Sequence, residues 1–116
     1  MQNNIVNLEL GMPTVENAKS KLDQALRSAR ARRLPWVKII HGYGSSGKGG
    51  AIKREVHRAL AAKLTRGEIQ GFVPGEDFSP FHAGARAAAD RCPELLRDRD
   101  YARGNDGVTI VVLLRS

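Results

Sequence analysis

The 116-residue sequence contains a single cysteine, Cys92, and no apolar run close to the ~18 to 20 residues that a bilayer-spanning helix needs. An internal disulfide is therefore excluded, and a membrane partner is not expected. The first residues, 1–7, are too polar for a signal peptide. These absences predict a cytoplasmic protein, because a lone thiol suits a reducing compartment.

Internal repeats and low-complexity tracts are also missing, and the length leaves no room for a second core. Apolar residues make up 41% of the chain and charged residues 27%, which is typical of soluble globular proteins. We therefore expect one domain over residues 1–116. Paired cysteines and His-x-x-x-His spacings are absent, so spacing alone predicts no metal site.

The charge is strongly positive, since nineteen Lys and Arg against twelve Asp and Glu leave a net +7. Most of these cations are arginines, whose planar guanidinium suits phosphate. A basic surface attracts polyanions whatever its fold. The charge therefore favours DNA or RNA as the partner.

Hydrophobic periodicity predicts an alternation of strands and helices. Thr14 is the expected N-cap of the first helix, which ends in the basic run 30–33. Strands are predicted over 5–10, 36–40, 68–73 and 108–114, and helices over 14–33, 52–64 and 81–92 with a further turn over 93–96. This order predicts an α/β fold with helices packed on a small sheet. The mixed-charge run 97–100 is expected to be a solvated loop.

A glycine-rich segment, residues 41–50, joins the predicted second strand to the second helix. It satisfies G-x-G-x-x-G at 42–47, yet the chain is too short for the long βαβ series of a dinucleotide fold. It also spells G-x-x-x-x-G-K at 42–48, but Gly49 stands where a P-loop needs Ser or Thr. Both motifs share exposed backbone N–H groups before a helix N-terminus, an arrangement that favours phosphate binding.

Three blocks of the sequence together resemble the Smr (small MutS-related) domain family. Leu8-Glu9-Leu10 with 14–18 is similar to the family's Leu-Asp-Leu-His-Gly strand and following helix. The segment 39–44 is similar to its central strand and His-Gly-x-Gly loop, and 104–113 to its glycine-rich turn and closing strand. Residues 76–100 fall outside these blocks and are interpreted as a helical or loop insertion.

The resemblance implies a two-layer α/β sandwich with a small mixed sheet, similar to the C-terminal domain of bacterial translation initiation factor three. It also implies nucleic-acid binding and, in several members, endonuclease or nicking activity. The family's first strand ends in His-Gly, whereas this chain has Gly11-Met12, and that departure puts hydrolysis in doubt.

Candidate site residues follow from the resemblance and from the glycine-rich segment. A nuclease needs an acid, a base and positive charge against the phosphate. His41 is the candidate acid or base, Glu9 would orient it or act as the base, and Lys48 would balance charge. Asp106 is the third predicted catalytic residue beside His41 and Glu9. Glu9 and Asp106 would hold Mg²⁺ if both reach the loop. The predicted nucleic-acid contacts are Gly42, Tyr43, Gly44, Ser45, Ser46, Gly47 and Lys48, together with Lys53, Arg54 and Arg58, which are expected to face solvent on the second helix.

Two alternatives stay open at this point. One is a non-catalytic module that binds RNA, a ribosome surface or a protein. The other is an enzyme acting on a small phosphate or nucleotide. The sequence does not choose between DNA and RNA, because phosphate contacts carry no base information.

Overall fold

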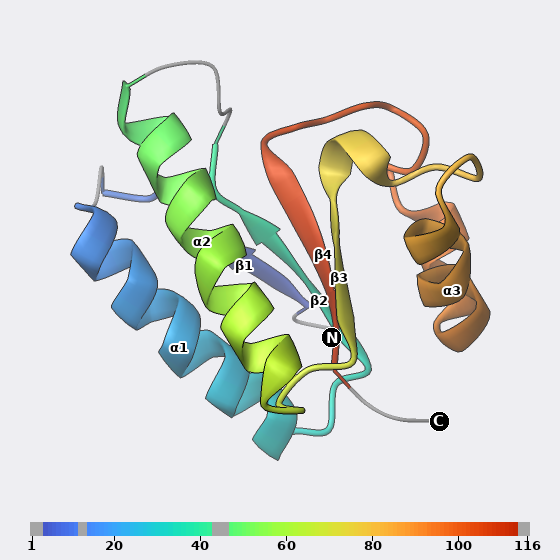
Figure 1. The fold of residues 1–116 in the computed structure, drawn as a ribbon, viewed down its shortest axis with the longest axis horizontal. Helices are drawn as coiled ribbons and strands as arrows, with labels where there is room; N and C mark the ends of the chain where they lie inside the picture. Colours follow the sequence, from blue (N-terminus) through green and yellow to red (C-terminus); the bar gives the residue numbers. More distant parts are fainter. Residues whose placement is uncertain (1–3, 12–13, 43–46, 114–116) are drawn as a thin grey trace.

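A computed structural model describes residues 4–11, 14–42 and 47–113, with the backbone alone for residues 47–49. Figure 1 shows a twisted sheet with helices packed on both faces. The elements in chain order are β1 (Ile5–Asn7), α1 (Val15–Ala31), β2 (Trp36–Ile40), α2 (Gly47–Thr65), β3 (Gly71–Pro74), the 3₁₀ turn η1 (Gly75–Asp77), α3 (Ala83–Arg91), the 3₁₀ turn η2 (Pro93–Arg97) and β4 (Val108–Val112).

Helix α1 begins and ends at residues with defined capping geometry. The predicted N-cap is confirmed, because the Thr14 hydroxyl accepts a hydrogen bond from the Asn17 N–H at 3.0 Å. At the other end, the Leu34 N–H bonds the Ala29 carbonyl and the Arg33 N–H bonds the Arg30 carbonyl, both at 3.0 Å. This pair of bonds is a Schellman motif, and Arg33 occupies its left-handed position with φ 58°.

The sheet is mixed, with strand order β1-β2-β4-β3. Strand β1 runs parallel to β2, while β4 is antiparallel to both of its neighbours. Two predicted strands are shorter than expected. The Glu9 N–H donates to the Asn7 side chain at 2.8 Å instead of to a neighbouring strand, so β1 ends at Asn7. The Glu68 N–H donates to the Lys63 carbonyl at 2.9 Å at the end of α2, so β3 begins later than predicted, at Gly71.

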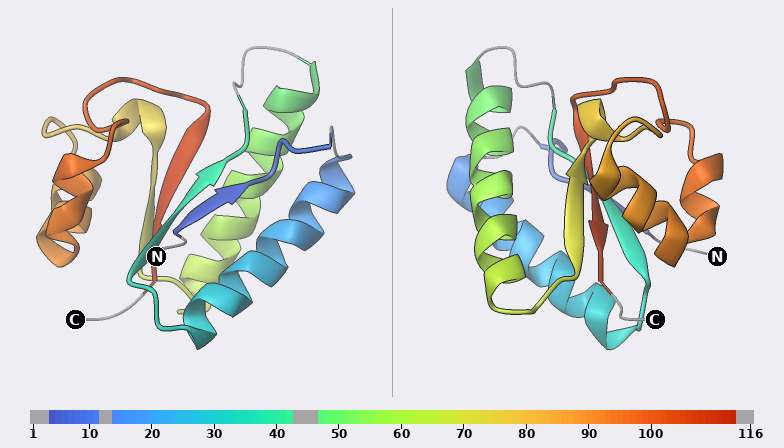
Figure 2. Two further views of the ribbon diagram at one scale, coloured as in Figure 1. Left: turned by 180° about the vertical axis from the view of Figure 1, so that it is seen from behind. Right: turned by 45° about the vertical axis from the view of Figure 1, so that its right-hand side comes forward.

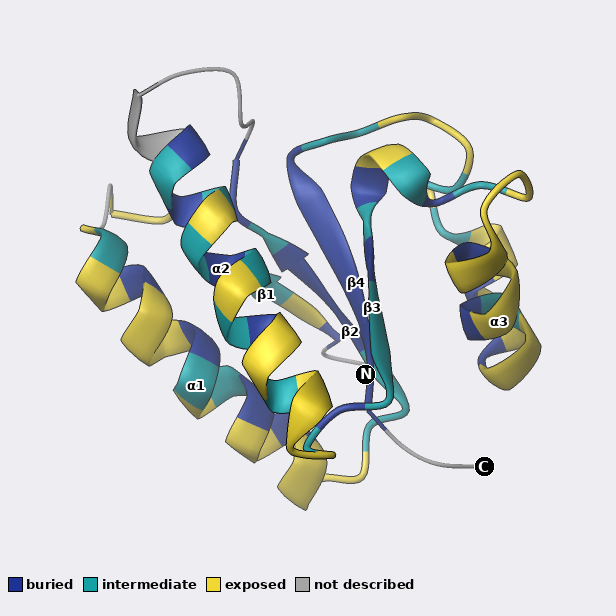
Figure 3. Cartoon of the chain, in the orientation of Figure 1, coloured by how far each residue is buried: buried dark blue, intermediate teal, exposed yellow. Residues whose placement is uncertain are grey.

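Helices α1 and α2 cover one face of the sheet, and the predicted α/β fold with helices packed on a small mixed sheet is confirmed. Buried Leu22, Leu26, Val56 and Leu60 pack there against strand residues of β2 and β4. The other face is covered by α3 and η2, as Figure 3 shows by the buried stripe of α3 turned toward the sheet. The segment predicted as an insertion thus adds a second apolar cluster.

A buried ion cluster ties that added layer to the sheet. The Lys38 ammonium on β2 lies 3.0 Å from Asp98 and 2.7 Å from Asp100, and the Asn105 amide donates to Asp100 at 2.9 Å. Burial opposes ionisation of Asp100, but the hydrogen bonds from Lys38 and Asn105 outweigh it and lower the pKa of that carboxyl. The expectation that 97–100 is a solvated loop is therefore wrong at both aspartates.

Candidate nucleic-acid interface

The candidate site lies at one edge of the sheet, where β1, β2 and β3 end and β4 begins. Leu8 donates its N–H to the Ile40 carbonyl at 2.8 Å, which draws the end of β1 against β2. The N–H groups of His41 and Gly42 both donate to the Gly107 carbonyl, at 3.0 and 3.1 Å. The three sequence blocks therefore meet at this edge, directly before the glycine-rich segment.

The imidazole of His41 is fully buried, and both of its ring nitrogens have partners. Nδ1 lies 2.9 Å from the Gly42 carbonyl, and Nε2 lies 2.8 Å from the Thr109 hydroxyl. A carbonyl oxygen can only accept, so Nδ1 carries the hydrogen and donates. In the neutral ring, Nε2 is then the acceptor, and the Thr109 hydroxyl donates to it.

A second histidine completes this arrangement from α2. The His57 Nε2 lies 2.9 Å from the same Thr109 hydroxyl, and the two imidazole rings meet edge to face with centroids 5.7 Å apart. Because the Thr109 hydrogen is already donated to His41, the hydroxyl accepts from His57 Nε2–H. The result is a directed chain from His57 through Thr109 and His41 to the Gly42 carbonyl.

Both histidines are held neutral near pH 7. Burial lowers the pKa of His41 below its usual 6.5, and the backbone hydrogen bond to Gly42 opposes this effect only in part. Burial also lowers the pKa of His57, reinforced by the positive charge of Lys53. A neutral pair is what the hydrogen-bond chain requires, because a second proton on His41 would remove the acceptor for Thr109.

Glu9 and Gly42 lie in close contact at the exposed side of this edge. Gly42 has φ +91°, a conformation that side chains rarely adopt, and a Cβ there would lie 2.6 Å from the Glu9 Oε2. Glycine is thus favoured by the backbone angle, whereas the Glu9 carboxylate, at the end of a flexible exposed side chain, can move aside. The carboxylate of Glu9 itself is exposed.

The three predicted catalytic residues come from segments that meet, but their side chains occupy different environments. His41 is buried, Glu9 is exposed, and Asp106 is half-buried next to Gly107. Among the residues that the structure describes, no hydrogen bond or ion pair joins the side chains of Glu9 or Asp106 to His41. Within the same residues, no group of three or more His, Cys, Asp or Glu side chains is placed to hold a metal ion.

The predicted nucleic-acid contacts divide into three groups. Tyr43, Gly44, Ser45 and Ser46 lie outside the described residues, while Gly47 and Lys48 form the first turn of α2. Arg54 and Arg58 are exposed as expected, with the Arg58 side chain 80% accessible. Lys53 differs from the expectation, because its ammonium pairs with Glu76 at 2.9 Å and its side chain is only 14% exposed. The turn after β3 carries Glu76 onto α2 and covers Lys53.

Two residues of this edge were not predicted as site residues. Thr109 is a single polar side chain within the apolar run 108–114, and a buried hydroxyl needs a hydrogen-bond partner, so the sequence contained that signal. His57 lies in the middle of the predicted second helix, where no motif marks it. Its partner was hidden, since only the tertiary fold brings α2 against β4.

Comparisons with known proteins agree with this geometry. The family model described as Smr domain matches residues 8–78. Among solved structures, the crystal structure of the Smr domain of Thermus thermophilus MutS2 is similar with a TM-score of 0.58 and 25% sequence identity, covering 97% of this chain and 100% of that one. No curated protein matches the sequence significantly. Within the described residues, no helix has both the length and the apolarity that crossing a membrane requires.

Proposed function

The chain belongs to the Smr domain family, a family of the nucleic-acid-binding and nuclease type, and on that premise we propose that it binds DNA or RNA by docking phosphates on residues 42–50 and the first turns of α2. The observation that carries this proposal is the position of the segment. It leaves the sheet at Gly42 and enters the N-terminus of a 19-residue helix whose first turn contains no acidic residue. The first N–H groups of a helix have no partner within the helix itself, and together with the positive end of the helix dipole they favour an anion.

Exposed cations extend this surface along α2. Arg54 and Arg58 face solvent beyond the first turn, and the nearest carboxylate to the Arg58 guanidinium is Glu55 at 3.9 Å. An ion pair this long on an exposed side chain contributes little to stability, so the guanidinium is free to bind phosphate. Lys53 is excluded from this role in the present conformation, because its ammonium is bound to Glu76.

In this proposal His41 is a positioning residue and does not contact the nucleic acid. Its ring is buried, and its Nδ1–H holds the Gly42 carbonyl at the point where the glycine-rich segment begins. The hydrogen-bond chain from His57 through Thr109 fixes the orientation of the ring. The chain therefore sets the direction in which the backbone leaves the sheet.

Nicking of the bound strand is the second candidate function, and one contact favours it. The Glu9 carboxylate lies exposed against Gly42, beside the proposed phosphate site, and the turn that carries Asp106 meets the same peptide through Gly107. Mg²⁺ is commonly held by one or two carboxylates together with substrate phosphates, and Glu9 with Asp106 fits that donor set. When bound, the ion would stabilise charge on the phosphate; without an ion, the exposed Glu9 carboxylate would be the base that accepts a proton from the attacking water.

Binding is tested by fluorescence anisotropy with labelled duplex DNA and structured RNA. We expect the affinity to fall steeply as salt rises from ~50 to ~200 mM, because bound phosphates release counterions. The variant Lys48→Gln/Arg54→Gln/Arg58→Gln should lose affinity and show a smaller salt slope. The matched control Arg91→Gln/Arg97→Gln/Arg103→Gln removes the same charge from exposed positions on the α3 side of the fold and should bind nearly as the wild type does. Equal losses in both variants would contradict a localised site.

Cleavage is tested separately with supercoiled plasmid and structured RNA in the presence of Mg²⁺. Nicking would convert the plasmid to an open circle and cut the RNA into shorter fragments. Loss of these products in Glu9→Gln, with binding retained, would support nicking. Cleavage that survives His41→Ala would agree with its positioning role. Binding without cleavage under the same conditions would support a non-catalytic nucleic-acid-binding module, and thermal stabilisation by a nucleotide but not by oligonucleotides would favour a small-molecule enzyme.

A further inference from the structure

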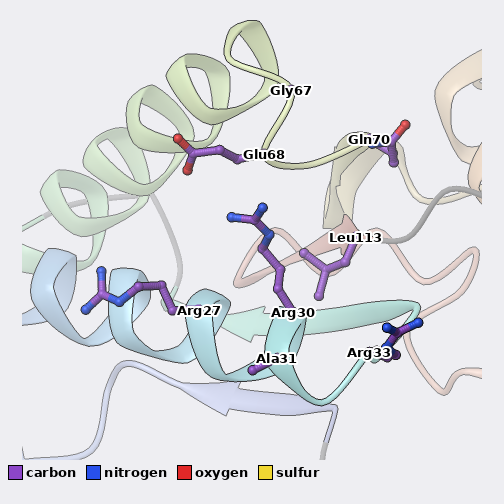
Figure 4. A pocket seen from close by; sticks show the side chains of 8 residues that line it. All are labelled: Arg27, Arg30, Ala31, Arg33, Gly67, Glu68, Gln70 and Leu113. Atoms are coloured by element: carbon purple, nitrogen blue, oxygen red, sulfur yellow. The ribbon is translucent and has the colours of Figure 1, made fainter.

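A second basic site lies at the opposite end of α2 from the glycine-rich segment. It is an open cavity of about 580 Å³ between the end of α1 and the turn that follows α2. Arg27, Arg30 and Arg33 line it from the α1 side, and Gly67 and Glu68 line it from the other. Figure 4 shows Arg30 reaching from α1 toward that turn, with Arg27 on one side and Arg33 on the other.

The carboxylate that lines this cavity, that of Glu68, is already paired with other cations. Glu68 accepts a hydrogen bond from the Arg66 Nε at 2.6 Å and lies 3.7 Å from the Lys63 ammonium. The bond from Arg66 lowers the pKa of Glu68, so the carboxylate stays ionised and paired. Among the described residues, Arg27, Arg30 and Arg33 form no ion pair of their own.

The backbone of Arg33 adds an independent observation. Its position in the Schellman motif is one that glycine usually fills, because a left-handed residue with a Cβ is strained. Here the position holds an arginine with φ 58°, whose side chain lines the cavity. Glycine would serve the helix end with less strain, so Arg33→Gly removes the guanidinium from the cavity without disturbing the end of α1.

We propose that Arg27, Arg30 and Arg33 form a second phosphate-binding site that contacts the same nucleic-acid strand or duplex as residues 42–50. This inference rests on the proposed function. The two sites lie at the two ends of α2, which spans Gly47–Thr65, and the 19 residues of this helix make them about 28 Å apart. Arg58 lies exposed on the helix between them.

The separation predicts a length requirement for the ligand. With one phosphate per ~3.4 Å of each duplex strand, a ligand must extend over roughly 8 base pairs to touch both sites. Hairpins of DNA and of RNA with stems of roughly 5 and roughly 16 base pairs, closed by the same loop, therefore serve as probes. The shorter stem can occupy one site only, so the wild type should bind the longer stem more tightly and with a steeper salt dependence.

The decisive variant is Arg27→Gln/Arg30→Gln/Arg33→Gly. For the longer stem we expect a loss of affinity of roughly tenfold or more and a salt slope smaller by about 2 to 3, because up to three phosphate contacts disappear. Affinity for the shorter stem should change much less, since the site at residues 42–50 remains. Arg91→Gln/Arg97→Gln/Arg103→Gln is again the control of equal charge.

The single variant Arg33→Gly separates binding from folding. Glycine relieves the left-handed strain, so Tm should rise by a few degrees while affinity for the longer stem falls. If Arg33 serves only the end of α1, Tm changes and affinity does not, and the inference is wrong. If the wild type binds neither hairpin at low salt, the proposed function itself fails. Binding that is lost equally from both stems would place all contacts in one site and would also overturn the inference.

Discussion

On the face of the sheet that α1 and α2 cover, the described residues include a neutral chain of hydrogen-bonded side chains, whereas on the α3 face they include a buried cluster of charged ones. His41, Thr109 and His57 form a hydrogen-bond chain without net charge. Lys38, three residues before His41 on the same stretch of chain, lies on the other face and binds Asp98 and Asp100. The charged cluster joins two segments sixty residues apart, while the neutral chain orients one peptide at the start of the glycine-rich segment.

The comparison teaches how burial constrains each kind of group. A buried ion is stable only while all its partners are present, so the charged cluster holds the α3 layer in one position. A neutral hydrogen-bond chain costs less to bury and adds no fixed charge beside the proposed phosphate site. The fold therefore places its rigid ionic attachment away from that site.

The largest expected effect comes from breaking the charged cluster. Lys38→Met should lower the free energy of unfolding by about 3 to 5 kcal/mol, because Asp98 and Asp100 lose their buried counterion. Urea unfolding monitored by far-UV circular dichroism measures this loss. The control Lys38→Met/Asp98→Asn/Asp100→Asn should recover much of it. A loss in the single variant of less than about 1 kcal/mol would show that the cluster is not an obligatory attachment.

A smaller loss of stability is expected when the neutral hydrogen-bond chain of His41, Thr109 and His57 is broken. Thr109→Val keeps the shape of the side chain but leaves the Nε2 atoms of His41 and His57 without their shared partner. The free energy of unfolding should fall by about 1 to 3 kcal/mol. Thr109→Ser retains the hydroxyl, so it should restore the ring tautomers seen by ¹⁵N NMR. Unchanged histidine tautomers in Thr109→Val would rule out the directed chain.

The smallest expected effect is the pH dependence of the free energy of unfolding, which should differ between the neutral histidines and the charged Asp100. Because the pKa values of His41 and His57 are lowered by burial, the unfolded state binds protons first, and stability falls as the pH drops below 6.5. The slope is at most about 1.4 kcal/mol per pH unit for each histidine. Asp100 behaves differently: its lowered pKa contributes stability above 3.8 that is lost only in stronger acid.

Urea unfolding at a series of pH values between 7.5 and 3 checks both windows. His41→Gln should flatten the decline below pH 6.5, because it removes one of the two buried imidazoles. Asp100→Asn should alter only the acid window. A decline below pH 6.5 that is as steep in His41→Gln as in the wild type would assign it to other groups.

Local signals predicted much of the fold. The N-cap at Thr14 and the strand 36–40 depend on a few neighbouring residues, and both are confirmed. The ends of β1 and β3 differ from the prediction because hydrogen bonds from Glu9 and Glu68 to nearby groups compete with strand pairing. Sequence periodicity does not report such local competition.

The site was predictable where a motif marked it and not where distant segments meet. His41 and Gly42 follow a strand directly before the glycine-rich segment, and both lie at the sheet edge as that position implies. The pairing of His57 with Thr109 depends on the packing of α2 against β4, which only the tertiary fold provides. The ion pairs of Lys38 with Asp98 and Asp100 were not predictable, because the partners lie 60 and 62 residues away in the sequence and no motif links them. The roles predicted for residues 43–46 stay predictions.

The central position of β4 has a consequence for synthesis on the ribosome. This strand hydrogen-bonds to both β2 and β3, yet it is translated after every other element of the sheet. Until residues 108–112 leave the exit tunnel, β2 and β3 each present an open edge, and open edges invite pairing with other chains. The nascent domain therefore depends on its last-made strand to close the gap, and a release of the chain before that point would leave a product prone to association.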